Sequence, residues 1–169
     1  MRRRRNQRGQ AAVEYALLYA GVILPMTFAI IFAAEMLWVW HSVVDFTREG
    51  ARYAATHCWQ PGGDNVLAFM RTNVPRMIDM DQFQGGNAEI EVRYFSRDPD
   101  TGMLVDFDCA NGECSTLCVP DFVSVRVASY EFRRFVNFLG LPPVQIPGFR
   151  TSLPIGSAGC DPEQGTCLP

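Results

Sequence analysis

The sequence predicts an α+β protein in which a long N-terminal helix, membrane-spanning in its first half, packs by its outer half on a small antiparallel sheet. Three observations indicate this. An uncharged apolar stretch of 20 residues begins at Tyr15, a helical stretch without proline follows it, and apolar residues alternate with polar ones in the C-terminal half.

Charge is distributed unevenly along the chain. All 15 basic residues are arginine, and five of them precede Gly9, so ten remain to face 18 acidic residues. The main body is therefore strongly acidic, which argues against nucleic acid as its partner. The basic cluster is a local signal at the N-terminal end.

The uncharged stretch Tyr15–Ala34 is long enough to cross a membrane. As a helix it covers ~30 Å, the thickness of a bilayer's hydrocarbon core. Tyr15 and Tyr19 at its start and Trp38 just beyond its end fit interfacial aromatic belts. Because the arginines precede the span, the positive-inside rule predicts a cytoplasmic N-terminus and a C-terminal domain outside. A buried core helix is rarely so long and apolar. A cleaved secretory signal has a shorter apolar core and a small-residue cleavage site, and no clear site follows here.

The helix is expected to continue beyond the span. Met36–Cys58 contains one glycine and no proline, and Pro61 with two glycines then ends the pattern. A single helix over Gln10–Cys58 would be ~73 Å long. Close-spaced opposite charges in its outer half predict a solvent-exposed face formed by Arg48, Glu49 and Arg52.

Gly9 is followed by "QAAVE", which places Glu14 fifth after the glycine, and this pattern resembles the processing site of type IV prepilins. The run that continues to Met36, with Pro25 inside it, is similar to the start of TadE-like proteins, the small pseudopilins of tight-adherence (Tad) pili. Thr47–Trp59 is similar to a second segment of that family. The two segments cover about 50 residues. The cysteine-rich outer region and a mature chain beginning with Gln10 depart from the family pattern.

The resemblance implies a processing step and an assembly step. A prepilin peptidase would remove the leader, residues 1–9, after Gly9 and leave Gln10 as the first residue. In a filament, Glu14 would pair with the freed α-amino group of Gln10 in a neighbouring subunit. This pair would set the axial register, because either charge left alone in a dry helix bundle is costly. From position alone, Glu14 could instead be a snorkelling residue at the interface, where a carboxylate costs less than the ~2.5–3.5 kcal/mol of mid-bilayer.

Gly21 and Pro25 interrupt the apolar helix. Proline lacks the N–H and clashes with the preceding turn, so a kink or a locally melted turn is expected here. The resemblance implies local unwinding as the subunit moves from membrane to filament. At the outer boundary, Glu35 and His41 are expected to be interfacial residues, with no further role assigned.

The outer domain, residues 59–169, is predicted to contain one short helix and several strands. Asp64 is expected to cap a helix that Pro75 ends or kinks. Alternating residues predict a hairpin over Ala88–Phe107 with a turn at residues 98–102. The strongest strand pattern covers Phe122–Phe132. A fourth strand is predicted at residues 149–155, at a sheet edge because it contains a proline.

Six cysteines follow the span: Cys58, Cys109, Cys114, Cys118, Cys160 and Cys167. An even number in a domain facing an oxidising compartment predicts up to three disulfides, for which 15 pairings exist. Cys160–Cys167 is the best local pair, and Cys58 with one of the middle three would tie the helix to the sheet. The alternative is zinc bound by the middle three cysteines with His57, but their C-x4-C-x3-C spacing lacks the usual C-x2-C pair.

Nothing in the sequence predicts catalysis or a cofactor. It contains no Gly-rich phosphate loop, no G-x-S-x-G elbow and no H-E-x-x-H helix. The acid pairs Asp98/Asp100 and Asp106/Asp108 could bind Ca²⁺, although turn and surface roles fit them better.

We therefore expect a minor pilin-like subunit of a Tad-type pilus that seeds, joins or tips the filament. Its expected partners are other pilin and pseudopilin subunits, the prepilin peptidase, an inner-membrane assembly platform and membrane lipid. The resemblance implies a bacterial inner-membrane location before assembly. The alternative is a signal-anchored envelope binding protein that never polymerises, for which cleavage after Gly9 would be absent.

Overall fold

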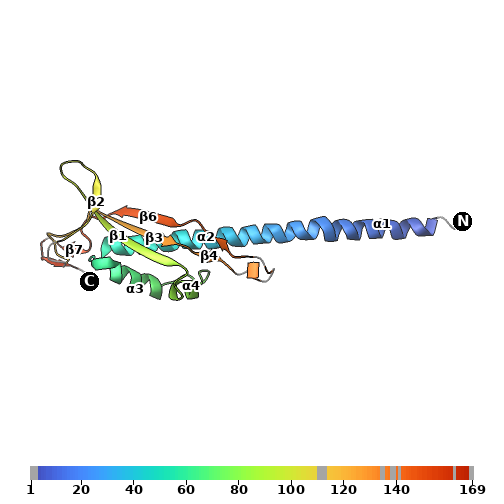
Figure 1. The fold of residues 1–169 in the computed structure, drawn as a ribbon, viewed down its shortest axis with the longest axis horizontal. Coiled ribbons are helices and arrows are strands. Elements are labelled where there is room, and N and C mark those ends of the chain that lie inside the picture. The colour runs from blue at the N-terminus through green and yellow to red at the C-terminus, as the bar shows by residue number, and fades with distance from the viewer. Residues whose placement is uncertain are drawn as a thin grey trace. The chain divides into compact units, whose positions relative to one another are not determined.

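The computed structural model describes residues 4–109, 114–133, 136–137, 140, 142–161 and 163–167, with side chains from residue 9 onward. The chain forms two compact units, Met1–Trp38 and Val39–Pro169, which are described in turn (Figure 1).

The first unit is helical. Helix α1 (Arg4–Leu18) passes into a five-residue π-helical turn, η1 (Tyr19–Ile23), and then into α2 (Leu24–Thr56), whose first part belongs to this unit. The helix thus begins six residues before the predicted start at Gln10 and ends two residues before Cys58. The segment expected to be a leader is helical from Arg4 onward, so no break in secondary structure marks the predicted processing site.

The second unit begins with the outer part of α2. Its buried residues recur at helical spacing and form one stripe that faces the rest of the unit: Val39, Val43, Phe46, Thr47, Gly50, Ala51 and Ala54. The charged residues between them, Arg48, Glu49 and Arg52, are exposed, as the sequence predicts. Arg48 contacts Asp45 at 3.4 Å with both side chains largely exposed, a geometry that contributes little to stability.

A four-stranded antiparallel sheet packs against this stripe, in the strand order β2-β1-β3-β6. Its members are β1 (Glu89–Arg97), β2 (Leu104–Asp106), β3 (Phe122–Ala128) and β6 (Phe149–Pro154). Two contacts join the helix to the edge strand β6. The Thr47 and Thr151 hydroxyls lie 3.1 Å apart, and the Trp40 and Phe149 rings lie 5.5 Å apart. The predicted α+β class is confirmed.

Strand β3 is the centre of the sheet and of the core. It pairs with β1 on one side and with β6 on the other, and Val123, Val125 and Val127 are almost completely buried. The sequence pattern predicts one strand from Phe122 to Phe132, which is wrong at its end. Ser129 has φ of 58°, a left-handed conformation that a continuing strand cannot contain, so β3 stops at Ala128.

The predicted hairpin of β1 and β2 is present, with Arg97 opposite Leu104. Its turn is held by the Asp98 carboxylate, which accepts hydrogen bonds from the backbone N–H groups of Asp100 at 2.8 Å and Thr101 at 2.9 Å. These bonds lower the pKa of Asp98. The acid pair Asp98/Asp100 therefore has a turn role, as its sequence context favoured.

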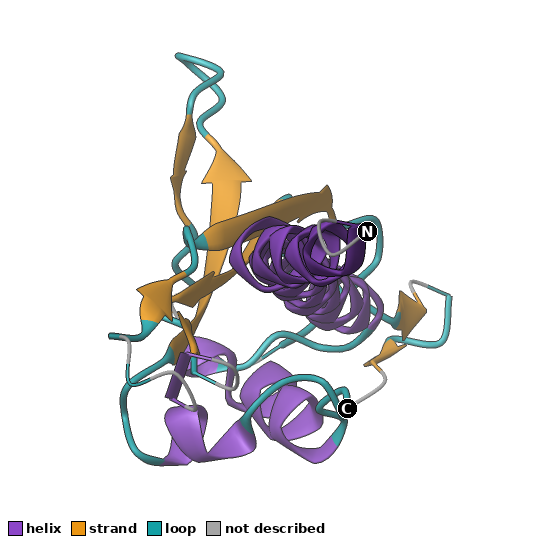
Figure 2. Cartoon of the chain, turned by 90° about the vertical axis from the view of Figure 1, so that its right-hand side faces the viewer, coloured by secondary structure: helices purple, strands orange, loops and turns teal. Residues whose placement is uncertain are grey.

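Two short helices contact the side of α2 away from β6, as Figure 2 shows. Helix α3 (Asp64–Thr72) approaches closely at Gly50, where a Cβ would lie 2.5 Å from the Met70 sulfur. Helix α4 (Met80–Gln84) places Phe83 against Phe46, with ring centroids 6.1 Å apart. Helix α3 starts after Gly63, and no side-chain hydrogen bond caps it, so the predicted cap at Asp64 is wrong.

The turn that enters α3 is a 3-10 turn, η2 (Pro61–Gly63), and it lies directly on the sheet. Gly62 and Gly63 have φ of 71° and 74°, which is the left-handed region that favours glycine. A Cβ on Gly63 would lie 2.5 Å from the Cβ of Val92 in β1. This glycine therefore meets two requirements at once, a left-handed backbone and a close approach to a strand.

Two small strand pairs complete the second unit. Strand β4 (Glu131–Phe132) pairs with β5 (Val144–Gln145), and β7 (Cys160–Asp161) pairs with β8 (Thr166–Cys167). Strands β5, β7 and β8 and helix α4 are not predicted by the sequence pattern. Each has five residues or fewer, which is too short for a periodic pattern to be recognised.

Candidate functional site: the N-terminal helix and the disulfide cluster

The predicted processing and assembly residues lie together in helix α1. Gly9, Gln10 and Glu14 are exposed, and among the described residues nothing outside the local helix backbone and the two chain neighbours lies within 4 Å of where a Gly9 side chain would begin. The Gln10 side-chain amide donates a hydrogen bond of 3.4 Å to the Glu14 carboxylate, one helical turn away. At this length the bond is weak. Glu14 is therefore available to a stronger partner.

The apolar residues that follow Glu14 face outward all around the helix. The helix Gly9–Thr56 is long enough to cross a membrane, its most apolar window has a mean hydropathy of 2.2, and none of that window is buried within the chain. Exposed side chains there include Leu17, Val22, Met26, Phe28 and Ile30. A helix with this surface needs an apolar environment, so it is a candidate membrane anchor.

The π-helical turn η1 lies where Gly21 and Pro25 were predicted to disturb the helix. The N–H of Leu24 donates to the carbonyl of Tyr19, five residues back, which widens the turn immediately before Pro25. Proline at position 25 has no N–H to offer the Gly21 carbonyl, and a wider turn gives its ring room. Thr27 also donates its hydroxyl to the carbonyl of Ile23 at 2.8 Å. The chain accommodates Pro25 by one wide turn, without melting a turn.

The residues predicted at the outer end of the span are exposed. Glu35 and His41 both lie on the surface of α2, and the His41 ring is 6.2 Å from that of Trp40. Trp40 also contacts Phe149, so this aromatic side chain adjoins the core of the second unit. Neither Glu35 nor His41 acquires a further role from these contacts.

All six cysteines form disulfides, in the pairs Cys58–Cys114, Cys109–Cys118 and Cys160–Cys167. The disulfide prediction is confirmed, including the local Cys160–Cys167 pair and the link from the helix end to one of the middle three cysteines. Cys58–Cys114 joins segments 56 residues apart, so it constrains the unfolded chain most.

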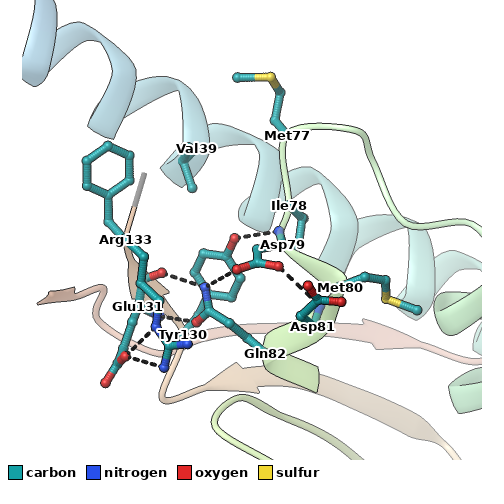
Figure 3. A pocket seen from close by; sticks show the side chains of 11 residues that line it. Val39, Met77, Ile78, Asp79, Met80, Asp81, Gln82, Tyr130, Glu131 and Arg133 are labelled. Carbon is teal, nitrogen blue, oxygen red and sulfur yellow. Dashed lines mark hydrogen bonds and ion pairs between the residues drawn. The ribbon is translucent and has the colours of Figure 1, made fainter. Parts of the chain in front are cut away.

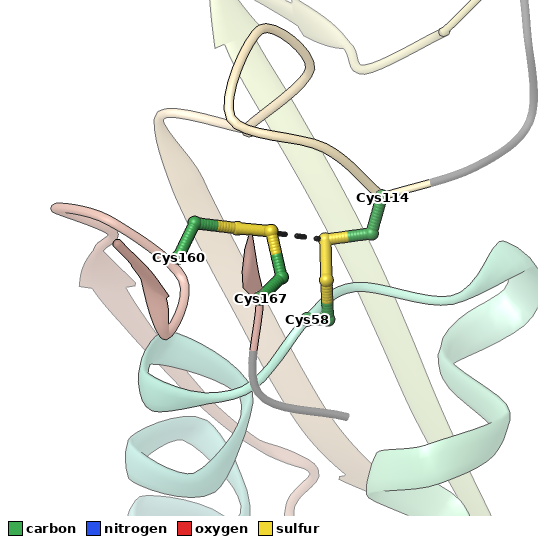
Figure 4. A group of neighbouring side chains, drawn as sticks. All are labelled: Cys58, Cys114, Cys160 and Cys167. Atoms are coloured by element: carbon green, nitrogen blue, oxygen red, sulfur yellow. Dashed lines mark hydrogen bonds between the residues drawn. A yellow bond between two sulfur atoms is a disulfide. The ribbon is translucent and has the colours of Figure 1, made fainter. Parts of the chain in front are cut away.

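Two of these disulfides lie side by side, as Figure 4 shows. The Sγ atoms of Cys58, Cys114, Cys160 and Cys167 all lie within 4.8 Å of one another, and those of Cys114 and Cys160 are 3.9 Å apart. Cys58 and Cys160 are buried, whereas Cys114 and Cys167 are partly exposed. Spacing along the sequence could not reveal this cluster, because its members come from three separated segments.

The zinc alternative from sequence shares only Cys114 with this cluster. Cys109 and Cys118 pair with each other, outside the cluster. His57 stacks on Tyr53 with ring centroids 3.8 Å apart, and its Nδ1 lies 3.0 Å from the Tyr53 carbonyl. The residues of that alternative are therefore not gathered into one site.

A cavity of about 330 Å³ adjoins helix α4 and strand β4 (Figure 3). The Gln82 side chain crosses it, accepts a hydrogen bond from the Glu131 N–H at 2.9 Å and donates to the Glu131 carbonyl at 2.8 Å. The Tyr130 hydroxyl accepts from the Asp79 N–H at 2.7 Å, and Arg133 forms an ion pair with Glu131 at 2.7 Å. These bonds satisfy polar groups within the fold, which is a structural role.

A second cavity, of about 420 Å³, lies between the turn η2 and the hairpin. Its walls include Trp59, Tyr94 and Phe107, with Trp59 edge-on to Phe107 at 5.0 Å. Asp106 and Asp108, the second acid pair considered from sequence, lie along it. Burial raises the pKa of Tyr94 to about 12, and its hydroxyl has no hydrogen-bond partner among the described residues.

Comparison with known proteins gives one match. A family model described as TadE-like protein matches residues 9–52, which confirms the resemblance of the segment that contains Gly9, Glu14 and Pro25. Of the second predicted segment, Thr47–Trp59, the match includes only residues 47–52. Comparisons with curated proteins and with solved structures returned no match. The matched segment ends inside helix α2, before the disulfide cluster.

Proposed function

Because residues 9–52 are TadE-like, we propose that this chain is a minor pilin-like subunit of a Tad-type pilus, with a structural role in seeding, joining or tipping the filament. The observation that carries the proposal is one helix with two surfaces. Its first part exposes apolar side chains on every side, and its outer part buries one stripe in an α+β unit. A subunit that is first membrane-anchored and then packed in a helical bundle needs both surfaces.

The subunit is proposed to sit in the inner membrane with its N-terminus in the cytoplasm and the cysteine-containing unit outside. The arginines before Gly9 and the three disulfides after the span support this orientation. Its proposed partners are other pilin and pseudopilin subunits, an inner-membrane assembly platform and membrane lipid.

Processing by a prepilin peptidase is the first proposed event. Hydrolysis of the Gly9–Gln10 peptide bond leaves a carboxylate on Gly9 and a free α-amino group on Gln10. Gly9 is exposed and offers no side chain to obstruct a peptidase, which supports cleavage at this bond.

The Glu14 carboxylate is proposed to pair with the Gln10 α-amino group of a neighbouring subunit. Within one chain, the contact between the Gln10 amide and Glu14 is only a 3.4 Å hydrogen bond on an exposed surface. An ammonium partner would form a stronger, charge-assisted bond once both groups are enclosed by helices. The pair would also set the axial register, since any other register leaves a charge unpaired in a dry bundle.

The experiment measures leader cleavage, membrane abundance and pilus formation for four variants in the native host. Gly9→Val should block cleavage and assembly together. Glu14→Leu should insert and be cleaved like wild type but fail to assemble, and Glu14→Gln should be partly rescued because it keeps hydrogen bonding without charge. Glu35→Leu removes the exposed carboxylate just beyond the uncharged stretch Tyr15–Ala34 and is the matched control, with assembly expected to be unchanged.

Intact mass of the protein from native membranes supplies the first readout. A mature chain beginning at Gln10 supports the proposal. Two results together would instead support a signal-anchored envelope binding protein that does not polymerise. The chain would retain its arginine leader, and pilus formation would be the same for Glu14→Leu as for the wild type.

A further inference from the structure

We propose that Cys58, Cys114, Cys160 and Cys167 form a zinc-binding site when their two disulfides are reduced. These four sulfur atoms form one group in the described part of the chain, with every Sγ–Sγ distance at or below 4.8 Å (Figure 4). This cluster lies beyond the matched segment 9–52, and the proposal does not depend on the pilus role.

The spacing of the sulfur atoms suits a tetrahedral zinc ion. With Zn–S bonds of ~2.3 Å, a tetrahedron places its sulfur atoms about 3.8 Å apart. Cys114 and Cys160, which belong to different disulfides, are already separated by 3.9 Å at Sγ. Opening the two disulfides lets the bonded sulfur atoms separate by less than 2 Å, as estimated from an S–S bond of ~2.05 Å, which side-chain rotation can supply.

The protein backbone fixes all four ligands from elements that are held independently. Strands β7 and β8 place Cys160 directly opposite Cys167. Cys58 follows the end of α2, where its carbonyl accepts a 2.6 Å hydrogen bond from the Asn65 side chain. Cys114 adjoins the Ser115–Cys118 bridge. An ion at the centre would therefore keep the two links that the disulfides make, Cys58 to Cys114 and Cys160 to Cys167, and would also join the two pairs to each other.

The donor set and its burial point to a structural type of zinc site. Four thiolates complete the coordination of zinc and leave no position for a substrate. Two of the ligands are buried and two are partly exposed, so the site is partly shielded from water and an ion can still reach it from solvent. Thiolate ligands also favour zinc over calcium or magnesium, which prefer oxygen.

A phosphine attacks each disulfide and, with one water, is oxidised to the phosphine oxide while the disulfide is reduced to two thiols. Four thiols then bind one Zn²⁺ and release four protons, which gives a tetrathiolate centre with a net charge of −2. Zinc itself is not oxidised or reduced.

The test uses the full chain in detergent micelles, reduced with a phosphine that is then removed, and titrated anaerobically with Co²⁺ as a spectroscopic substitute. We expect one cobalt per chain, with the intense absorption of tetrahedral thiolate coordination, displaced by one equivalent of Zn²⁺. Alkylation followed by peptide mapping then counts the protected thiols. Four of the six should be protected by zinc, while Cys109 and Cys118 should react.

Two double variants separate the cluster from the third disulfide. Cys109→Ser/Cys118→Ser keeps all four ligands and should still bind one cobalt with the same spectrum. Cys160→Ser/Cys167→Ser removes half of the ligands and should lose that spectrum. If the reduced chain unfolds, zinc should restore its circular dichroism, because binding is then coupled to folding.

The proposal is overturned if zinc protects no thiols in the wild-type chain, or protects Cys109 and Cys118 as well as the four. It is also overturned if the cobalt spectrum survives the loss of Cys160 and Cys167, or if zinc does not refold a reduced chain that has unfolded. Protection of the four cluster thiols alone supports it.

Discussion

The close approach of Gly63 to strand β1 can be tested by adding a single methyl group. In Gly63→Ala the new Cβ would lie 2.5 Å from the Cβ of Val92 and 2.6 Å from its Cγ1. The Val92 Cβ is attached to a strand paired with β3, so it cannot rotate away as the end of a flexible side chain could. The backbone of residue 63 must also keep φ near 74°.

The loss of stability in Gly63→Ala has two sources, the left-handed backbone of residue 63 and the contact of the new methyl group with Val92. A non-glycine residue in the left-handed region costs about 1–2 kcal/mol. Overpacking of a well-packed site costs about 1–3 kcal/mol. Gly63→Ala is therefore expected to lower the free energy of unfolding by about 2–5 kcal/mol.

Gly62→Ala is the matched control. Gly62 has nearly the same φ, 71°, but its Cβ would meet only the Asp64 carboxylate, at 3.8 Å. Its free energy of unfolding should fall only by the cost of a left-handed alanine, about 1–2 kcal/mol. The difference between the two variants isolates the approach of the turn to the strand.

The assay is thermal unfolding of the full chain in mild detergent without reductant, followed by near-ultraviolet circular dichroism. For a unit of this size, 1 kcal/mol corresponds to a shift in Tm of about 3–5 °C. Gly63→Ala should therefore unfold at a temperature about 3–15 °C below Gly62→Ala. Equal Tm values for the two variants would refute the argument, because they would show that Val92 does not constrain residue 63.

Two further predictions concern buried chemistry in the second unit. Because burial raises the pKa of Tyr94 from 10 to about 12, the folded chain keeps a proton that the unfolded chain loses first. The contribution of Tyr94 to stability should be constant below pH 10 and fall between pH 10 and about 12. Tyr94→Phe should abolish this fall, measured as Tm against pH. A decline of the same size in the variant would contradict the assignment. Removing a disulfide should lower the free energy of unfolding by an amount that grows with the length of the loop it closes. In the chain-entropy model the loss is about 4 kcal/mol for Cys58→Ser/Cys114→Ser and about 2.5 kcal/mol for Cys160→Ser/Cys167→Ser. Denaturant unfolding measures which double variant loses more stability. Equal losses would show that loop length does not determine the contribution of each disulfide.

Local patterns predicted the elements that are long or strongly periodic. The uncharged run after Glu14, the alternation in β1 and the turn at Asp98 each contain their own signal, so the helix and the hairpin followed from sequence. The end of β3 could not be predicted in this way. Ser129 adopts a left-handed conformation that redirects the chain, and the sequence contains no glycine at this position to indicate it.

The sites that depend on tertiary structure were predicted only in part. Six cysteines in a small outer domain indicate disulfides, but the proximity of two disulfides requires the helix end, a loop and the strand pair β7–β8 to meet. The π-helical turn was also predicted only in part. Pro25 predicted a disturbance, yet whether a helix kinks, melts or widens depends on bonds such as that from Leu24 to Tyr19.

The wide turn at Tyr19–Ile23 also changes which residues share a face of the apolar helix. A π-helical turn contains about one residue more than an α-helical turn, so everything before it is rotated by about 100° about the axis. Counting in steps of an undisturbed α-helix would align Glu14 with Phe28 and Phe32. With one residue inserted, the line from Glu14 runs instead through Met26, Ala29 and Ala33, so both phenylalanines on it are replaced by alanine. A neighbouring apolar helix that lies along the Glu14 side can therefore approach the backbone closely at Ala29 and Ala33, as small residues permit in membranes.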